Sequence, residues 1–161
     1  MKVTNIADLE RVGADADLRR LYLYWHARRG ARAFPSRDDI DPVEFDYALG
    51  RVSLIDVLES PPRFYYRVVS TQLTRHLGYE MTGKFLDQAP EPEMRDFAER
   101  HYRRALSAAA PLYENDGVVL DGRRWRQESL ALPLSSDGQA INMLMIYRVT
   151  GEPAAAEPGH R

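Results

Sequence analysis

The sequence predicts an α+β fold that is built on one antiparallel sheet. Strand-like runs of apolar and β-branched residues cluster in the middle and at the end of the chain, and helical patterns lie before and between them. The last runs are separated by Asp-Gly steps, which favour hairpin turns between antiparallel strands. This arrangement predicts a single sheet with the helices packed on it.

The length and composition fit one soluble domain. The chain has 161 residues, of which 44% are hydrophobic and 29% charged. It has no cysteine, which excludes disulfides, thiolate metal ligands and cysteine nucleophiles. The formal net charge of -2 argues against a nucleic-acid partner. Since no run reaches the ~20 apolar residues of a membrane span and no signal peptide is recognisable, we expect a cytoplasmic protein without a membrane partner.

The first predicted helix carries an amphipathic pattern. Residues 1–14 are polar, and we expect a flexible N-terminus there. Asp15 or Asp17 fits the cap of the helix, and Gly30 fits its end. Apolar side chains recur at i, i+3, i+4 and i+7 and predict one buried face. This face consists of Leu18, Leu21, Tyr22 and Trp25.

A short helix and two strands follow. Asp41 and Pro42 fit the cap and the first position of a helix that reaches Leu49. The runs 51–58 and 63–70 are strand-like, and the two prolines between them exclude a helical connection. We therefore expect a hairpin or a short loop between these two strands.

Two helices occupy the centre of the chain. The first covers 71–77 and stops at Gly78, because glycine tolerates the left-handed conformation at a helix end. The second covers 91–109, with Pro92 in its first turn. Its inward side is predicted to hold Met94, Phe97, Ala98, His101 and Ala105, with Tyr102 beside them.

Three strands end the domain. They are expected at 112–120, 124–134 and 140–149, with turns at Asp121-Gly122 and Asp137-Gly138. The tail 151–161 is small and polar and is expected to be disordered, which leaves 15–150 as the domain.

The last strand is apolar on both faces. Alternation puts four residues on one face (Ile141, Met143, Met145, Tyr147) and two on the other (Leu144, Ile146). Such a strand is central and covered on both sides. The long helix fits one cover, and the helix around Trp25, or a partner subunit, fits the other.

A glycine pair in the middle of the chain raises the question of a phosphate site. Gly78, Gly83 and Lys84 have the spacing G-x-x-x-x-G-K of a phosphate-binding loop. However, a helix and not a strand leads into the segment, and Phe85 stands where a magnesium-binding hydroxyl is needed. We therefore interpret the glycines as corners of the chain.

The same segment resembles the signature of PAS domains. The resemblance is carried by Tyr66–Thr71, Leu77–Tyr79 and Thr82–Leu86, and the order of elements over 18–149 agrees with it. The chain is also similar to a bacterial family of small, stand-alone PAS-type proteins of uncharacterised role. Many PAS domains place Asn before the short helix, whereas Ser70 and Thr71 stand here, and either hydroxyl fits as a helix cap.

The resemblance implies a non-enzymatic sensory or interaction module. It implies a five-stranded antiparallel sheet with helices on one face and an N-terminal amphipathic helix. PAS domains hold haem, flavin, a small metabolite or nothing between the sheet and the long helix. They often dimerise through a helix before the first strand, which makes a homodimer and a separate signalling partner the expected partners. The candidate interface is Leu18, Leu21, Tyr22 and Trp25; the alternative is that this face packs within the chain.

The predicted pocket has two interpretations as well. The candidate lining is Phe97, His101, Trp125, Met143, Met145 and Tyr147. His101 lies where some haem-binding PAS domains have the axial ligand, while flavin adduct chemistry is excluded because it needs a cysteine. The alternative is that these side chains fill an ordinary core.

Two further function classes stay open. One is a small enzyme of the isomerase or dehydratase kind, which would use a cavity with His101 and Tyr66. The other is a structural interaction protein with a filled core. The acidic residues Asp38, Asp39, Asp41 and Glu44 could serve acid–base or metal chemistry, but helix capping and solvated charge explain them better.

Overall fold

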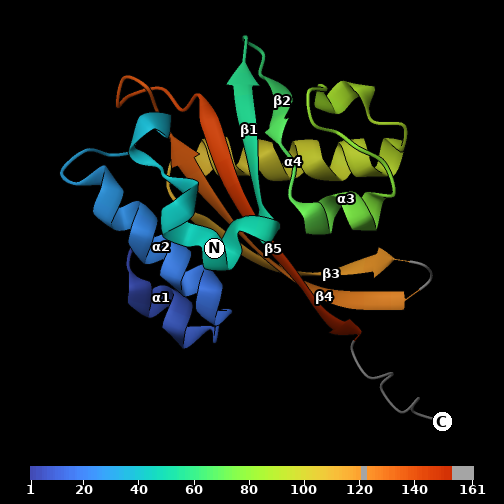
Figure 1. Ribbon diagram of the computed structural model, residues 1–161, viewed down its shortest axis with the longest axis horizontal. Coiled ribbons are helices and arrows are strands. Elements are labelled where there is room, and N and C mark those ends of the chain that lie inside the picture. Colours follow the sequence, from blue (N-terminus) through green and yellow to red (C-terminus); the bar gives the residue numbers. More distant parts are fainter. Residues whose placement is uncertain (121–122, 154–161) are drawn as a thin grey trace.

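The computed structural model describes residues 1–120 and 123–153, and the side chains of these except those of 118–120, 123 and 152–153. Five strands form one antiparallel sheet in the order β2-β1-β5-β4-β3 (Figure 1). This confirms the predicted fold class. The strands are β1 (Val52–Leu58), β2 (Arg63–Val68), β3 (Leu112–Leu120), β4 (Arg123–Leu134) and β5 (Met143–Pro153).

Helices cover both faces of the sheet (Figure 1). The N-terminal helices and one 3-10 helix, η2, cover one face, and the two central helices cover the other. The α-helices are α1 (Ile6–Arg11), α2 (Ala16–Arg29), α3 (Thr71–Leu77) and α4 (Pro92–Ala108). The 3-10 helices are η1 (Arg37–Asp39), η2 (Pro42–Arg51) and η3 (Leu86–Gln88).

Strand β5 lies at the centre of the sheet and separates two apolar cores. Met145 and Tyr147 belong to the core beneath α2, and Leu144 and Ile146 belong to the core beneath α4. All four are at most 3% exposed. Burying each side chain of this size contributes about 1.5–3 kcal/mol to stability. The prediction of a central strand that is covered on both sides is confirmed.

The N-terminal segment is packed onto the domain, so the prediction that it is loose is wrong. Val3 and Leu9 are buried, and Lys2 forms an isolated bridge with Leu112. The terminal amine donates to the carbonyl of Tyr113 at 2.7 Å, and the Val3 amide donates to the carbonyl of Pro111 at 2.8 Å. The segment thereby covers the start of the exposed edge of β3, which would otherwise leave backbone groups unpaired.

Helix α2 lies on the sheet as its amphipathic pattern predicts. Asp15 caps its first turn by accepting from the Leu18 amide at 3.1 Å. Gly30 follows its last residue with a φ of 59°, a conformation that favours glycine. The Trp25 indole Nε1 donates to the carbonyl of Pro133 on β4 at 2.9 Å. One buried side chain thus joins the helix to the sheet.

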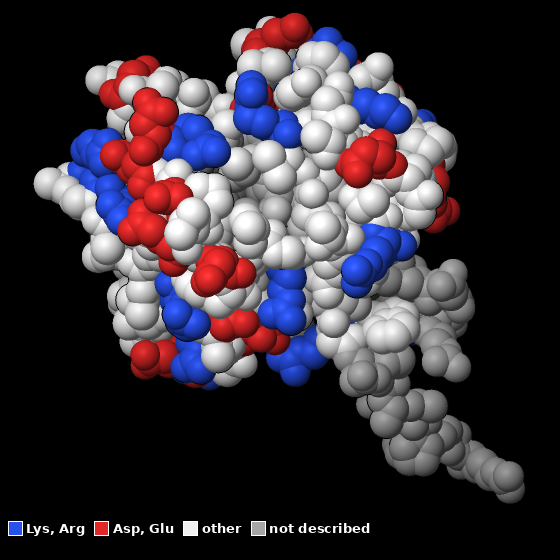
Figure 2. Space-filling view, in the orientation of Figure 1, with Lys and Arg blue, Asp and Glu red and all other residues white. Residues whose placement is uncertain are grey.

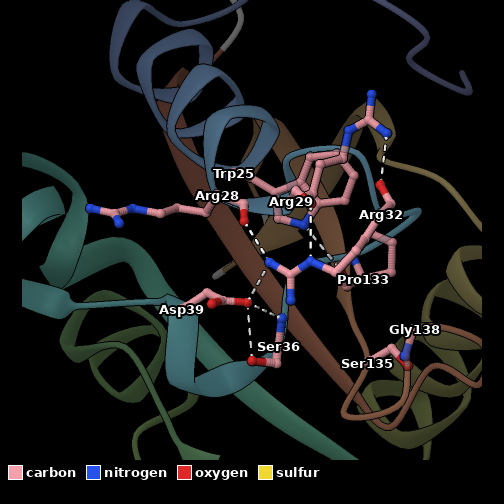
Figure 3. A network of polar contacts seen from close by, with 9 residues as sticks. All are labelled: Trp25, Arg28, Arg29, Arg32, Ser36, Asp39, Pro133, Ser135 and Gly138. Atoms are coloured by element: carbon pink, nitrogen blue, oxygen red, sulfur yellow. Dashed lines mark hydrogen bonds and ion pairs between the residues drawn. The ribbon is translucent and has the colours of Figure 1, made fainter.

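A polar network fixes the chain that leaves α2 (Figure 3). The Arg32 guanidinium donates to the carbonyl oxygens of Arg28 at 2.9 Å and Arg29 at 3.1 Å. It also forms an ion pair of 2.8 Å with Asp39, whose carboxylate accepts from the Ser36 amide at 2.8 Å. Free carbonyls at a helix end need such donors. The segment between α2 and η2 is therefore tied to the helix end.

The glycine pair forms corners, as predicted. Gly78 ends α3 with a φ of 79°, and Gly83 has a φ of 80°. The Gly83 amide donates to the carbonyl of Tyr66 at 2.7 Å, and the Tyr66 amide donates to the carbonyl of Lys84 at 2.9 Å. The amides of Gly78 and Lys84 likewise donate to the carbonyls of Thr74 and Met81. Because the three amides of the motif already have backbone partners, they are not arranged to hold a phosphate.

The predicted ends of the last strands need correction. The turn expected at 121–122 lies outside the described residues. β5 begins at Met143 and not at 140, because the Asp137 carboxylate accepts from the amides of Gln139 and Ala140 and holds them in the loop. β5 then continues past 150, since Thr150 pairs with Gln127 on β4. Of the expected tail 151–161, the first three residues belong to the strand, and 154–161 lie outside the described residues.

Replacing Trp25 with Phe tests the joint between α2 and the sheet. The substitution removes a buried hydrogen bond and part of a buried ring, so we expect a loss of roughly 1–3 kcal/mol in the free energy of unfolding. Chemical denaturation followed by circular dichroism measures it. The control is Val43→Ala on η2, where the side chain is 80% exposed, and we expect it to change stability by less than about 0.5 kcal/mol. Equal losses of stability in both variants would show that Trp25 does not join α2 to the sheet.

Candidate functional site

Aromatic and apolar side chains fill the space between the sheet and α4. Phe64 and Tyr66 reach it from β2, Tyr102 from α4 and Met81 from the segment after α3. Each is at most 3% exposed. The Phe64 and Tyr102 rings meet edge to face at 5.2 Å, a favoured arrangement for aromatic pairs. The part of the fold in which the resemblance implies a pocket is therefore largely a packed core.

A chain of polar groups crosses this core beneath α4. The hydroxyls of Tyr66 and Tyr102 are 2.8 Å apart, which makes a buried hydrogen bond. Beside them, the Nη2 atom of Arg148 on β5 lies 3.1 Å from Nδ1 of His101. The His101 Nε2 atom lies 3.9 Å from Oε2 of Glu114 on β3. We refer to these five residues as the α4 polar cluster.

The position of Arg148 determines the state of His101. A guanidinium only donates, so Nδ1 of His101 accepts and the proton is on Nε2, which faces Glu114. Burial, together with the charge of Arg148, lowers the pKa of His101 to about 3. The imidazole is therefore neutral near pH 7.

The other titratable groups of the cluster are also held in their usual states. Burial raises the pKa of Tyr66 well above 10 and also raises the pKa of Tyr102, so both phenols stay protonated. Burial is the largest influence on Glu114 and raises its pKa, but the hydrogen bonds from Arg104, at 2.8 and 3.0 Å, together with the positive charges around the carboxylate bring the pKa below its ordinary value.

This arrangement does not support the enzyme alternative. Tyr66 is bonded to Tyr102 and not to His101, so the two predicted residues do not form an acid–base pair. The carboxylate of Glu114 is engaged by Arg104. A general base needs a free lone pair within reach of a substrate proton, whereas Nδ1 of His101 accepts from Arg148 and the carboxylate of Glu114 accepts from Arg104.

Half of the predicted pocket lining lies on the opposite face of the sheet. Met143, Met145 and Tyr147 belong to the core beneath α2, so their expected place between the sheet and α4 is wrong. The reason is the alternation of β5, which directs Leu144 and Ile146 to α4 instead.

The other half of the predicted lining is divided. His101 is buried in the α4 polar cluster, and Phe97 is half-buried one turn before it on α4. Trp125 lies on β4 close to the end of the β3–β4 hairpin, where it is half-buried. Ligand contact by these three residues stays a prediction.

Tyr147 has a structural role that the sequence did not indicate. Its hydroxyl donates to the carboxylate of Asp15 at 2.7 Å and accepts from Arg51 Nη1 at 3.1 Å. Burial raises the pKa of Tyr147 far above its ordinary value, so the phenol keeps its proton. Since Asp15 also caps α2, Tyr147 holds the start of that helix on the sheet.

The candidate interface residues are buried within the chain. Leu18 and Leu21 are 0% exposed, Tyr22 is 2% exposed and Trp25 is 3% exposed. They pack on the face of the sheet that carries Met145 and Tyr147. The intramolecular alternative therefore applies, and these four side chains are not available to a second subunit.

The residues of this space do not fit haem or flavin. The nitrogens of His101 face Arg148 and Glu114, and the large side chains of Tyr66 and Tyr102 meet where a flat ring system would need room. A ligand of that size needs a pocket of about 300 Å³ or more.

The acidic residues near η1 and η2 are engaged with neighbours. Asp39 pairs with Arg32 (Figure 3), and Asp41 accepts from the Val43 amide at 3.0 Å. Glu44 forms an ion pair with Arg28 and accepts from the Tyr24 hydroxyl at 3.1 Å. In the described part of the chain, no group of three or more His, Asp or Glu residues could hold a metal ion. These residues cap helices and balance charge.

The comparison with known families identifies the class of protein. A model of the PAS domain family matches residues 14–147, so this chain belongs to the PAS domain family. Members of this family are generally sensory or interaction modules that do not catalyse reactions. No curated protein matches the chain. Over the described residues, none of the helices is both long and apolar enough to cross a membrane.

Sequence reasoning missed two members of the α4 polar cluster, Glu114 and Arg148. A signal for Arg148 was present, because it follows Leu144 and Ile146 at a spacing of two and so shares their face. Glu114 stands two residues after the buried Leu112 in the same way. Alternation along a strand does not indicate that His101 on α4 lies beside both Arg148 on β5 and Glu114 on β3.

The state of His101 predicts a pH dependence of stability. Its pKa is about 3 in the folded protein and about 6.5 when unfolded, so the unfolded chain binds more protons between these values. Stability is therefore complete above pH 6.5 and falls as the pH falls, by roughly 2 kcal/mol between pH 7 and pH 5.

Urea denaturation of the wild type and of His101→Gln at both pH values measures this loss. We expect the variant to lose about 2 kcal/mol less than the wild type over this interval. His76→Gln is the control, because His76 is exposed on α3, and it should behave as the wild type does. A wild type and a His101→Gln variant with the same pH dependence would show that His101 does not titrate in this way.

Proposed function

We propose that this PAS domain acts as a protein-interaction module in signalling, with its output passed to a second protein or to a second copy of the chain. The observation that carries the proposal is the filled space beneath α4. Tyr66 and Tyr102 occupy its centre and bond to each other, which favours a rigid scaffold over a carrier of haem or flavin. Under this proposal, recognition takes place on the surface.

The outer surface of the domain supports a specific contact more than a general electrostatic one. Figure 2 shows basic and acidic side chains interspersed on the face drawn. The helix before β1 is the element through which PAS domains often dimerise. Its inner face is used by the chain itself, but Leu23 on its outer face is 49% exposed. We infer that a homodimer forms through α2 and uses the surface around Leu23.

A first experiment tests whether the domain works without a chromophore. Protein purified from its own source is examined by absorbance spectroscopy and by native mass spectrometry. We expect a spectrum with only the aromatic band and a mass equal to that of two polypeptide chains, with no haem or flavin bound. Stoichiometric haem or flavin in this material would refute the proposal.

A second experiment tests the contact through α2. Light scattering of the wild type is expected to give twice the chain mass, and Leu23→Arg is expected to give the mass of a monomer with unchanged circular dichroism. The control is Val68→Arg on the edge strand β2, where the side chain is 43% exposed; it should stay dimeric. A wild type that is monomeric at all concentrations would exclude the homodimer, and a dimeric Leu23→Arg would exclude this contact.

A further inference from the structure

Arg148 carries a positive charge that no carboxylate in the described part of the chain neutralises. Its side chain is partly buried on the α4 face of β5, and its hydrogen bond goes to the neutral ring of His101 at 3.1 Å. Its Nε atom is buried and has no partner among the described residues. A buried donor without an acceptor is costly. The Nε–H group of Arg148 therefore needs an acceptor that the surrounding side chains do not supply.

Arg148 also lines a small hollow. It is lined by Ser53, Ser70, Leu73, Tyr102, Ile146 and Arg148, and its volume is about 10 Å³. That volume is about the space that one water molecule needs. Leu73 and Ile146 give it apolar walls, and none of the lining residues is a carboxylate. The hollow thus combines a positive charge with a low-dielectric wall, in which charge interactions are strong.

Ser53 and Ser70, which line this hollow, each have a hydroxyl hydrogen that can be donated. The Ser53 hydroxyl oxygen accepts from the Ser70 amide at 2.9 Å, and the Ser70 hydroxyl oxygen accepts from the Leu73 amide at 3.1 Å. Each oxygen therefore already has a donor, and its hydroxyl hydrogen remains to be donated. Both serines are at most 5% exposed, which fixes their positions.

We propose that this hollow binds a single-atom monovalent anion of the size of chloride, held by the Arg148 guanidinium and by the hydroxyls of Ser53 and Ser70. The three groups come from β5, β1 and the start of α3, so the bound anion joins these elements. Size and charge both select the ligand. A larger metabolite does not fit the volume, and a cation is repelled by Arg148. The inference does not depend on the proposed interaction function.

Thermal unfolding in different sodium salts tests this site. Chloride is compared with gluconate at equal ionic strength, because gluconate is an anion too large for the hollow. Binding to the folded state alone raises the melting temperature by roughly 3–6 °C at about ten times the dissociation constant. We expect a saturable rise with chloride in the wild type.

Two variants assign the effect to the hollow. Arg148→Gln removes the charge, and we expect it to lose the anion-dependent rise. Arg100→Gln removes an exposed arginine of α4 and should keep it. A rise of equal size in gluconate, or one that survives in Arg148→Gln, would overturn the proposal.

If Arg148→Gln does not fold, crystals of the wild type grown or soaked in bromide provide a second test. Ser53→Ala then serves as the variant for comparison. We expect an anomalous peak in the hollow, within hydrogen-bond distance of Arg148, and a weaker or absent peak in Ser53→Ala. Peaks confined to the outer surface would mean an adventitious ion only, and the proposal would be wrong.

Discussion

The structure depends on one constraint: β5 is apolar on both faces and must be covered on both faces. Met145 and Tyr147 point to one side and Leu144 and Ile146 to the other, and all are buried. A single layer of helices would leave one of these rows in water, at a cost of about 1.5–3 kcal/mol for each large side chain. The chain meets the constraint by itself, with α4 on one side and α2 on the other.

This constraint explains how the N-terminal segment is used. The aromatic face of α2 is buried against the sheet, and the Trp25 indole donates a hydrogen bond to the carbonyl of Pro133. Tyr147, Asp15 and Arg51 fix the start of the helix, while Arg32 ties down its end. A helix held at both ends is part of the domain. Association with other proteins must therefore use its outer surface or another part of the molecule.

The packing of α4 on the sheet leaves little room for a large ligand in the interior. Tyr66 and Tyr102 fill the space beneath α4, and polar groups that are unfavourable in an apolar core are paired with each other there. Arg148 is the exception, since its charge faces a neutral histidine and a small hollow. The space beneath α4 is thus packed where a cofactor would need room.

Local patterns predicted most of the fold. The cap at Ser70, the end of α3 at Gly78 and the corner at Gly83 follow from the chemistry of single residues, and each lies where the sequence indicates. The packing of residues 1–14 was missed, because their few apolar side chains, such as Val3 and Leu9, are diluted by polar neighbours.

The candidate site was harder to predict, for a physical reason. Alternation divides the residues of β5 into two sets, but it does not tell which set faces α4, because that depends on strand order and on the path of the connections. The pocket residues Met143, Met145 and Tyr147 were therefore assigned to the wrong side. The pairing of Arg148 with His101 joins residues that are 47 positions apart in sequence, and no local pattern carries such information.

The most direct test of the double cover is a nuclear Overhauser measurement on the Trp25 indole. In a sample that mixes isotope-labelled and unlabelled chains, the account predicts contacts from the indole N–H to Pro133 and Leu132 within one chain. It predicts none of these contacts in the spectrum that is filtered for signals between different chains. Contacts that appear in the filtered spectrum would show that α2 covers a partner's sheet, and they would contradict the account.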